Sequence, residues 1–361
     1  MGAREESLTL HDRARAFVRA FEEGRASPEP FDALASDLAR FQARYIAGYK
    51  NLVTARGLDP SRFLRAAEAP AVPTDAFKVA RVSAFPEEET PTTFRTSGTT
   101  VGARGSHFFR DTSTYEAAAV AFARTTLLRG FPERVHVVVL GPSASALPDS
   151  SLSHMNDAFV RAFGLPNDGN AFFLQDDILD VAALDETIAR ILITGDAPVL
   201  LLATALACVH LLDAVGDAGF RLPQGSRVMQ TGGFKGKSRE VQPSALRRDL
   251  ARAFHISEAD IVGEYGMTEL SSQFYEERGG GPYLEPPWAR VIPVDPVTLE
   301  PVDEGAEGIA RIEDLMNVDS AYAILAADRV RRVPGGFELL GRAPGAPPRG
   351  CSLTVDEILG R

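Results

Sequence analysis

Apolar residues recur at intervals of three and four along an early stretch of the chain, after the break at Pro28 and Pro30. This spacing places them on one face of an α-helix, so the pattern predicts an amphipathic helix. Together with its flanks, it indicates a helical N-terminal region over residues 1–72. The residues that carry the pattern are Leu34, Leu38, Phe41, Tyr45, Tyr49 and Leu52.

From residue 135 the pattern changes to short apolar runs separated by stretches with helical spacing. Alternation of this kind is typical of a parallel or mixed sheet covered by helices. We therefore predict an α/β lobe over residues 73–281. Its expected strands are 135–140, 172–174, 199–202, 228–230 and 261–262, and its expected helices are 151–163, 180–193, 205–215 and 243–254.

Beyond Gly279, Gly280 and Gly281 the chain becomes rich in β-forming residues. We expect strands at 290–294 and 308–313, and a hairpin of 331–333 with 337–340 around a Pro-Gly-Gly turn. These strands predict a smaller, β-rich lobe over residues 282–342. Residues 343–361 follow as a Pro/Gly tether and a C-terminal cysteine segment.

Composition limits the possible partners and location. The chain has 361 residues, of which 45% are hydrophobic and 24% charged, as in ordinary globular proteins. Its net charge of -11 argues against nucleic acid or an anionic membrane as partner. Two cysteines cannot build a disulfide framework, and the first residues lack the apolar core of a signal peptide, so we expect a cytoplasmic protein. The apolar run at 199–209 is about half the roughly 20 residues that span a bilayer, so no membrane span is expected.

Residues 96–105 combine glycines, hydroxyls and one cation after a strand-like lead-in. Glycines let backbone amides approach an anion, hydroxyls add hydrogen bonds, and an arginine adds charge. The run therefore predicts a phosphate-binding loop, with a purely structural turn as the alternative. No Gly-Lys-Ser/Thr triplet closes it, so it is not a Walker loop. The candidate phosphate ligands are Thr96, Ser97, Gly98, Thr99, Thr100 and Arg104.

Two further segments, residues 263–269 and residues 328–342, also carry candidate functional residues. We call residues 96–105, 263–269 and 328–342 the first, second and third islands. Glu269 is a hard oxygen ligand of the kind that Mg²⁺ prefers, and Thr268 beside it can donate to a phosphate. His107 lies next to the first island, and we expect it to have a hydrogen-bonded structural role. No His/Cys cluster has the spacing of a zinc site.

The three islands resemble those of the adenylate-forming ligases, whose loop reads Ser/Thr-Ser-Gly-Thr-Thr-Gly-x-x-Lys-Gly and whose second signature is Tyr-Gly-x-Thr-Glu. Val101 and Arg104 depart from the loop pattern. Within that superfamily the chain is most similar to the LuxE-type acyl-protein synthetases, through residues 148–153, 231–236 and 349–353. The resemblance covers the chain from about residue 73 onward.

The resemblance implies ATP and Mg²⁺ as cofactors and a carboxylic acid, fatty in the LuxE type, as substrate. Thr268 and Glu269 would act on the α-phosphate and the metal. Tyr265, followed by Gly266, would stack near adenine, and Gly232 and Gly233 would line the adenine side. Asp328 would accept the ribose hydroxyls, and Arg342 would reach the ribose or the phosphates.

Most adenylate-forming ligases carry a C-terminal domain with a catalytic lysine, whereas this chain has no lysine beyond Lys237. We therefore expect a truncated ligase in which Lys235, Lys237, Arg104, another arginine or a partner protein supplies the cation. Lys235, directly after the paired glycines and Phe234, is the preferred candidate, and a solvated loop lysine is the alternative.

Cys351 follows the tether, just before a capping-box pattern at residues 354–357 that predicts a short helix. A thiol near a helix N-terminus has a lowered pKa and is a better nucleophile. The resemblance implies that Cys351 receives the acyl group as a thioester, and an inert tail thiol is the alternative. Cys208 lies in an apolar run and is expected to be a buried small hydrophobe.

The sequence thus predicts an enzyme that activates a carboxylic acid as its adenylate. It then transfers the acyl group to Cys351 for hand-over to an acyl reductase or another acceptor protein. One alternative is a phenylacetate-type acyl-CoA ligase, in which CoA takes the acyl group. The other is a non-catalytic nucleotide-binding scaffold of an acyl-transfer complex.

Overall fold

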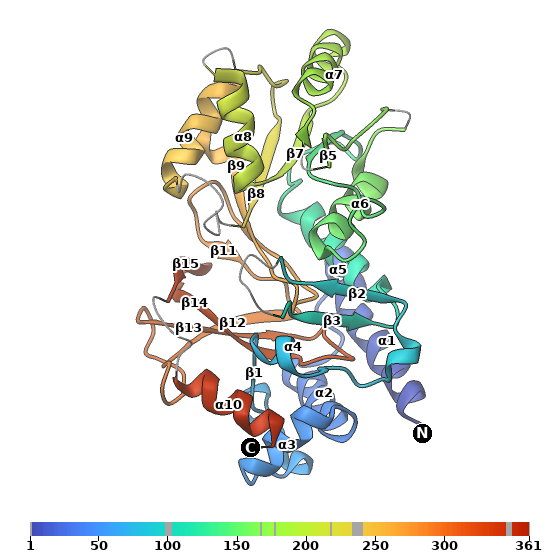
Figure 1. The fold of residues 1–361 in the computed structure, drawn as a ribbon, viewed down its shortest axis with the longest axis vertical. Helices are drawn as coiled ribbons and strands as arrows, with labels where there is room; N and C mark the ends of the chain where they lie inside the picture. Colours follow the sequence, from blue (N-terminus) through green and yellow to red (C-terminus); the bar gives the residue numbers. More distant parts are fainter. Residues whose placement is uncertain are drawn as a thin grey trace. The chain divides into compact units, whose positions relative to one another are not determined.

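The computed structural model describes residues 2–97, 103–166, 168–176, 178–216, 219–232, 241–343 and 349–360 (Figure 1). Contacts divide the chain into two compact units, each drawn from separate stretches of sequence. Unit 1 comprises Met1–Ala121, Met267–Gln273 and Leu284–Arg361, and unit 2 comprises Phe122–Gly266 and Phe274–Tyr283. Helices and a mixed set of strands make up the fold, which confirms the predicted α/β class.

The helices of unit 1 come from both ends of the chain. They are α1 (Ala3–Glu22), α2 (Phe31–Tyr45), α3 (Ala47–Ala55), α4 (Ala76–Val79) and α10 (Arg349–Leu359). The helix predicted around residues 34–52 is in fact two helices, because Ile46 has an extended backbone between α2 and α3. The apolar face continues across the break, since Ile46 is itself buried.

An antiparallel sheet forms the rest of unit 1. Its order is β12 (Ala289–Val294), β13 (Glu307–Asp314), β14 (Ala323–Val333) and β15 (Gly336–Arg342), with β1 (Val72–Pro73) parallel to β14. The predicted turn is present between β14 and β15, where Gly335 takes the positive φ of 88° that favours glycine. A separate hairpin pairs β2 (Thr92–Arg95) with β3 (Ser106–Phe109).

Unit 2 is built on parallel strands. Their order is β4 (His136–Leu140), β7 (Val199–Thr204), β8 (Arg227–Thr231) and β9 (Ile261–Tyr265), and β10 (Phe274–Glu276) pairs antiparallel to β9. The connecting helices are α6 (Ser151–Phe163), α7 (Val181–Thr194), α8 (Ala205–Val215) and α9 (Pro243–Phe254). Three of them have the predicted bounds. Unit 2 also contains β5 (Leu174–Gln175) and β6 (Ile178–Leu179), whereas α5 (Ser113–Thr125) and β11 (Tyr283–Leu284) each have residues in both units.

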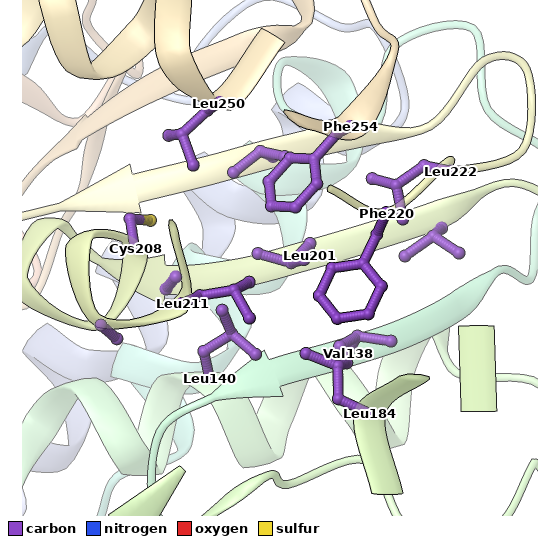
Figure 2. Packing of buried hydrophobic residues seen from close by; sticks show 14 of the residues in the cluster. Val138, Leu140, Leu184, Leu201, Cys208, Leu211, Phe220, Leu222, Leu250 and Phe254 are labelled. Atoms are coloured by element: carbon purple, nitrogen blue, oxygen red, sulfur yellow. The ribbon is translucent and has the colours of Figure 1, made fainter. Parts of the chain in front are cut away.

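One face of the parallel sheet is covered by an apolar core (Figure 2). Alternate strand residues project into it, among them Leu201, Val228 and Ile261, and they meet side chains of α8 and α9. Cys208 is fully buried in this core, and burial raises the pKa of its thiol to about 12. This confirms the prediction that Cys208 is a buried hydrophobe. Within the described residues, no helix has both the length and the apolar composition needed to cross a bilayer.

Candidate functional site

Two hydrogen bonds join the two ends of the first island at its base. The amide of Thr96, directly after β2, donates to the carbonyl of Gly105 (2.9 Å), and the amide of Gly105 donates to Oγ1 of Thr96 (2.9 Å). Because these bonds join residues nine apart, they close the chain into a loop at the open end of the β2–β3 hairpin. Of the predicted ligands in it, Gly98, Thr99 and Thr100 lie outside the described residues.

Arg104, the predicted cation of the loop, hydrogen bonds to the backbone at this base. Its Nε donates to the carbonyl of Thr96 (2.6 Å) and a terminal nitrogen donates to the carbonyl of Arg95 (3.2 Å). These contacts give the guanidinium a structural role in holding the loop ends. Its assignment to phosphate, like that of Ser97, stays a prediction.

Glu269 from the second island faces the base of the loop. Its Oε1 lies 3.4 Å from the position that a Cβ on Gly105 would take, and the Thr96 methyl lies 3.1 Å from the same position. A side chain at residue 105 would therefore crowd both. Because residue 105 is a glycine, the carboxyl of Glu269 lies next to bare backbone. Glu269 is only 5% exposed. The structure thus brings the first two islands together through Thr96, Gly105 and Glu269.

The backbone that carries Thr268 and Glu269 is held by two buried side chains that sequence reasoning did not assign to the site. Nδ1 of His107, on β3, lies 2.8 Å from the Thr268 carbonyl, and Nδ2 of Asn317 donates to the Glu269 carbonyl (2.9 Å). Burial lowers the pKa of His107 to about 4, so its ring is neutral and donates through Nδ1–H. The structural role expected for His107 is confirmed.

A magnesium ion fits this arrangement. Mg²⁺ in nucleotide sites is held by one or two carboxylates and otherwise by phosphate oxygens and water. Glu269 supplies one buried carboxylate, which lies against the glycine backbone at the base of the loop. In the part of the chain that the structure describes, no group of three His, Cys, Asp or Glu is arranged as a complete metal cage. Phosphate oxygens and water would supply the other ligands of such an ion.

The third island places its two predicted residues opposite each other. Asp328 on β14 and Arg342 on β15 are direct cross-strand partners, and Nε of Arg342 lies 3.7 Å from Oδ1 of Asp328. The Asp328 side chain is 21% exposed and that of Arg342 is 77% exposed. The pair is therefore open to a ligand.

Unit 2 contains the residues that are predicted to lie beside adenine. Gly232 follows β8 and Tyr265 ends β9, and these strands are parallel neighbours in which Thr231 pairs with Glu264. The Tyr265 ring is buried against Phe274 and Tyr283, with ring centroids 6.0 and 6.2 Å away. Gly266 is the last residue of this stretch of unit 2. Gly233 and Lys235 lie outside the described residues.

Glu264, next to Tyr265, is a buried acid that sequence reasoning missed. Oγ1 of Thr231 donates a hydrogen bond to its Oε2, and the residue is 7% exposed. Burial raises the pKa of this carboxyl to about 7. The only sequence signal was a charged residue at the end of an otherwise apolar strand.

The predictions for the environment of Cys351 are wrong in two respects. The last helix, α10, begins at Arg349 and not at Thr354, which is fully buried within it. Cys351 is only 4% exposed, and burial, with a smaller effect of Asp75, raises the pKa of its thiol to about 11. The desolvation outweighs any stabilisation of a thiolate by the helix N-terminus. Residues 344–348 of the predicted tether lie outside the described residues.

One face of α10, which includes Cys351, is buried because the helix packs against α3 and β1 (Figure 1). Arg56, at the end of α3, donates through Nε to Glu357 (3.0 Å) and through a terminal nitrogen to Thr354 (2.6 Å). Nδ2 of Asn51 donates to the carbonyl of Ile358 (3.1 Å). These contacts join residues about three hundred positions apart and hold the helix that carries the thiol.

Comparisons with known proteins identify the family and the fold. A family model described as "Acyl-protein synthetase, LuxE" matches residues 35–360. A solved structure of 2-hydroxyisobutyryl-CoA ligase in the postadenylation state with 2-HIB-AMP superposes with a TM-score of 0.61 at 15% identity, over 86% of this chain and 67% of that one. The same ligase with 2-HIB-AMP and CoA in the thioesterification state gives 0.62 at 15% identity, over 95% and 69%. The fold is therefore that of adenylate-forming ligases. No curated protein matches the sequence.

Proposed function

Because this chain belongs to the LuxE acyl-protein synthetase family, we propose that it activates a carboxylic acid with ATP and then carries the acyl group on Cys351. The observation that carries the proposal is the buried Glu269 carboxyl beside the closed end of the hydroxyl- and glycine-rich loop. That the structurally similar ligase was solved with an acyl-AMP supports the first half of the reaction.

In the first step a carboxylate oxygen attacks the α-phosphorus of ATP. The bond from that phosphorus to the bridging oxygen breaks, and pyrophosphate leaves. The amides and hydroxyls of the first island would bind the phosphates, and Thr268 would donate to the α-phosphate. Glu269 would hold Mg²⁺, which supplies positive charge at the phosphates. The Asp328 carboxylate would accept the ribose hydroxyls, and Tyr265 would lie near adenine.

In the second step the sulfur of Cys351, after losing its proton to water, attacks the acyl carbon. The bond from that carbon to the phosphate oxygen breaks, which forms a thioester and releases AMP. Because the thiol is buried with a raised pKa, this step requires α10 to leave α3. Hand-over to an acyl reductase or another acceptor protein would follow.

Carboxylate-dependent exchange of labelled pyrophosphate into ATP tests the proposal directly. The wild-type protein should catalyse exchange with at least one acid of a panel, and exchange should require Mg²⁺. A non-catalytic scaffold would show no exchange with any acid. An acyl-CoA ligase would show exchange but would need added CoA to form a thioester.

Loosening α10 should expose Cys351. Arg56→Ala removes the ion pair to Glu357 and the hydrogen bond to Thr354. Losing about 1–2 kcal/mol of docking free energy would raise the undocked fraction about 5- to 30-fold. The rate of Cys351 alkylation by iodoacetamide, followed by peptide mass spectrometry, should rise by a similar factor.

Arg25→Ala is the matched control, because Arg25 forms an exposed ion pair with Glu23 on the same unit. It should leave the alkylation rate unchanged, and Cys208 should stay unmodified in all variants. Equal alkylation of Cys351 in wild type and Arg56→Ala would contradict the role of Arg56 in holding α10.

Asp328→Ala should weaken ATP binding. Removal of the carboxylate would leave the ribose hydroxyls without their acceptor, which costs about 1–3 kcal/mol. Titration calorimetry of ATP binding measures the effect. Glu338→Ala on the same hairpin, where Glu338 pairs with exposed Arg331, should bind ATP like wild type. An unchanged affinity in Asp328→Ala would place the third island outside the nucleotide site.

A further inference from the structure

Polar side chains form a row across the sheet of unit 2 where its parallel strands end. Thr204 on β7, Thr231 on β8 and Glu264 on β9 are partners in register. Tyr275 on the antiparallel β10 continues the row beside Glu264. Ligands of open α/β sheets bind outside the carboxyl ends of parallel strands. The row therefore lies at the edge of unit 2 where a small molecule is expected.

The row projects from the face opposite the apolar core of Figure 2. Val228 and Ile261 belong to that core, and Thr231 and Glu264 each follow three residues later, so they point the other way. Tyr275 shares their face and packs on Phe122, with ring centroids 5.7 Å apart. Tyr265 projects to the opposite face from Glu264. The ring assigned to adenine and the buried carboxyl therefore do not share one side of the sheet.

Glu264 differs from Glu276, a buried acid on the neighbouring strand β10. Glu276 is saturated by protein groups, because a terminal nitrogen of Arg247 lies 2.8 Å from both its oxygens and the amides of Gly263 and Gly280 donate to Oε2. The Glu264 carboxyl receives the hydroxyl of Thr231, and within the described residues it has no ion pair with a cationic side chain. A buried carboxyl without a cation is costly unless a ligand donor completes its surroundings.

We propose that Glu264 and Thr231 determine the specificity for the carboxylic acid, by accepting a hydrogen bond from a hydroxyl or amino group on its acyl chain. The inference rests on the proposed adenylation, and it names the substrate class as acids with a polar donor rather than plain fatty acids. A plain alkyl chain against this edge would remove water from the carboxyl and return no hydrogen bond. Sites built for a polar group reject the analogue that lacks it more strongly than apolar pockets reject an extra methylene.

The ionisation of Glu264 adds a pH dependence. Burial raises the pKa of this carboxyl to about 7. Below that pH the group is neutral and pairs with hydroxyls. Above it the carboxylate favours an ammonium group. The preference for an amino acid over its plain analogue should therefore rise between pH 6 and pH 8, whereas the preference for a hydroxy acid should change less.

The test compares hexanoate with 2-hydroxyhexanoate, 3-hydroxyhexanoate, 6-hydroxyhexanoate and 6-aminohexanoate. Binding is measured by calorimetry and adenylation by pyrophosphate exchange, each on the full chain. At least one donor-bearing acid should exceed hexanoate about 100-fold in kcat/KM and in affinity. Glu264→Leu should abolish that preference and raise the kcat/KM and the affinity for hexanoate. Glu264→Gln keeps an acceptor, so its kcat/KM for a hydroxy acid should stay within about 10-fold of the wild-type value.

Gln230→Leu is the control, because Gln230 precedes Thr231 on β8 and projects to the other face. It should leave the preference unchanged. A wild-type protein that binds hexanoate as well as every donor-bearing acid would overturn the specificity inference and leave adenylation intact. If no acid supports exchange but the binding preference is present and is lost in Glu264→Leu, adenylation fails and the recognition site stands. If no acid of the panel binds, the inference is overturned.

Discussion

Glu269→Gln is expected to lower the rate of carboxylate-dependent pyrophosphate exchange by about 10²- to 10³-fold, the scale for losing one electrostatic contact to a transition state. The amide keeps the size of the side chain beside Gly105 but removes the negative charge that would hold Mg²⁺. Because the side chain is buried, water cannot easily substitute for it. The loss should therefore appear in the exchange rate at saturating acid and ATP.

Glu304→Gln provides the control, because Glu304 is an exposed acid of the same unit. It should exchange pyrophosphate at the wild-type rate. Circular dichroism of Glu269→Gln should match wild type, which separates loss of chemistry from loss of fold. Full exchange activity in correctly folded Glu269→Gln would remove Glu269 from the metal site.

Cys351→Ser is expected to abolish acylation of the protein while leaving pyrophosphate exchange within about 2-fold of wild type, because a group that does not contact the adenylation transition state adds little to its free energy. The two steps depend on different residues, since the thiol acts only after the adenylate exists. Intact mass spectrometry of wild type with ATP, Mg²⁺ and its acid should show one added acyl group that hydroxylamine removes. Cys351→Ser should show no hydroxylamine-labile mass.

Cys208→Ala should label like wild type, because Cys208 is enclosed in the core of unit 2. If the protein is an acyl-CoA ligase, wild type and Cys351→Ser will release acyl-CoA at comparable rates once CoA is added. Loss of exchange in folded Cys351→Ser would also count against the proposal, because it would give the thiol a role before the adenylate forms.

Much of the fold could be predicted because local and tertiary preferences agree. The strands β4 and β7 are apolar runs buried on both faces. The helices α6 and α8 are preceded by Ser150 and Thr204, whose side chains cap them. The break at Ile46 could not be predicted, because a buried β-branched residue continues the apolar pattern and the nearby Gly48 lies inside α3 rather than at the break.

The candidate site was predictable where its residues are contiguous, as in Tyr265 to Glu269, and not where distant residues complete it. His107 and Asn317 are ordinary polar residues until the fold places them against Thr268 and Glu269. The predicted start of α10 was wrong for the same reason. Thr354 fits a local capping pattern, but contacts with Arg56 in the distant α3 decide its position.

The docked state of Cys351 also bears on oxidative damage. Peroxides oxidise thiolates, and the sulfinic and sulfonic products of cysteine are irreversible for most proteins. A thiol that is 4% exposed, with its pKa raised to about 11, is almost entirely protonated at neutral pH. While α10 rests on α3, the proposed acyl acceptor is therefore protected from peroxide, and it becomes vulnerable to oxidation only in the undocked interval in which it can be acylated.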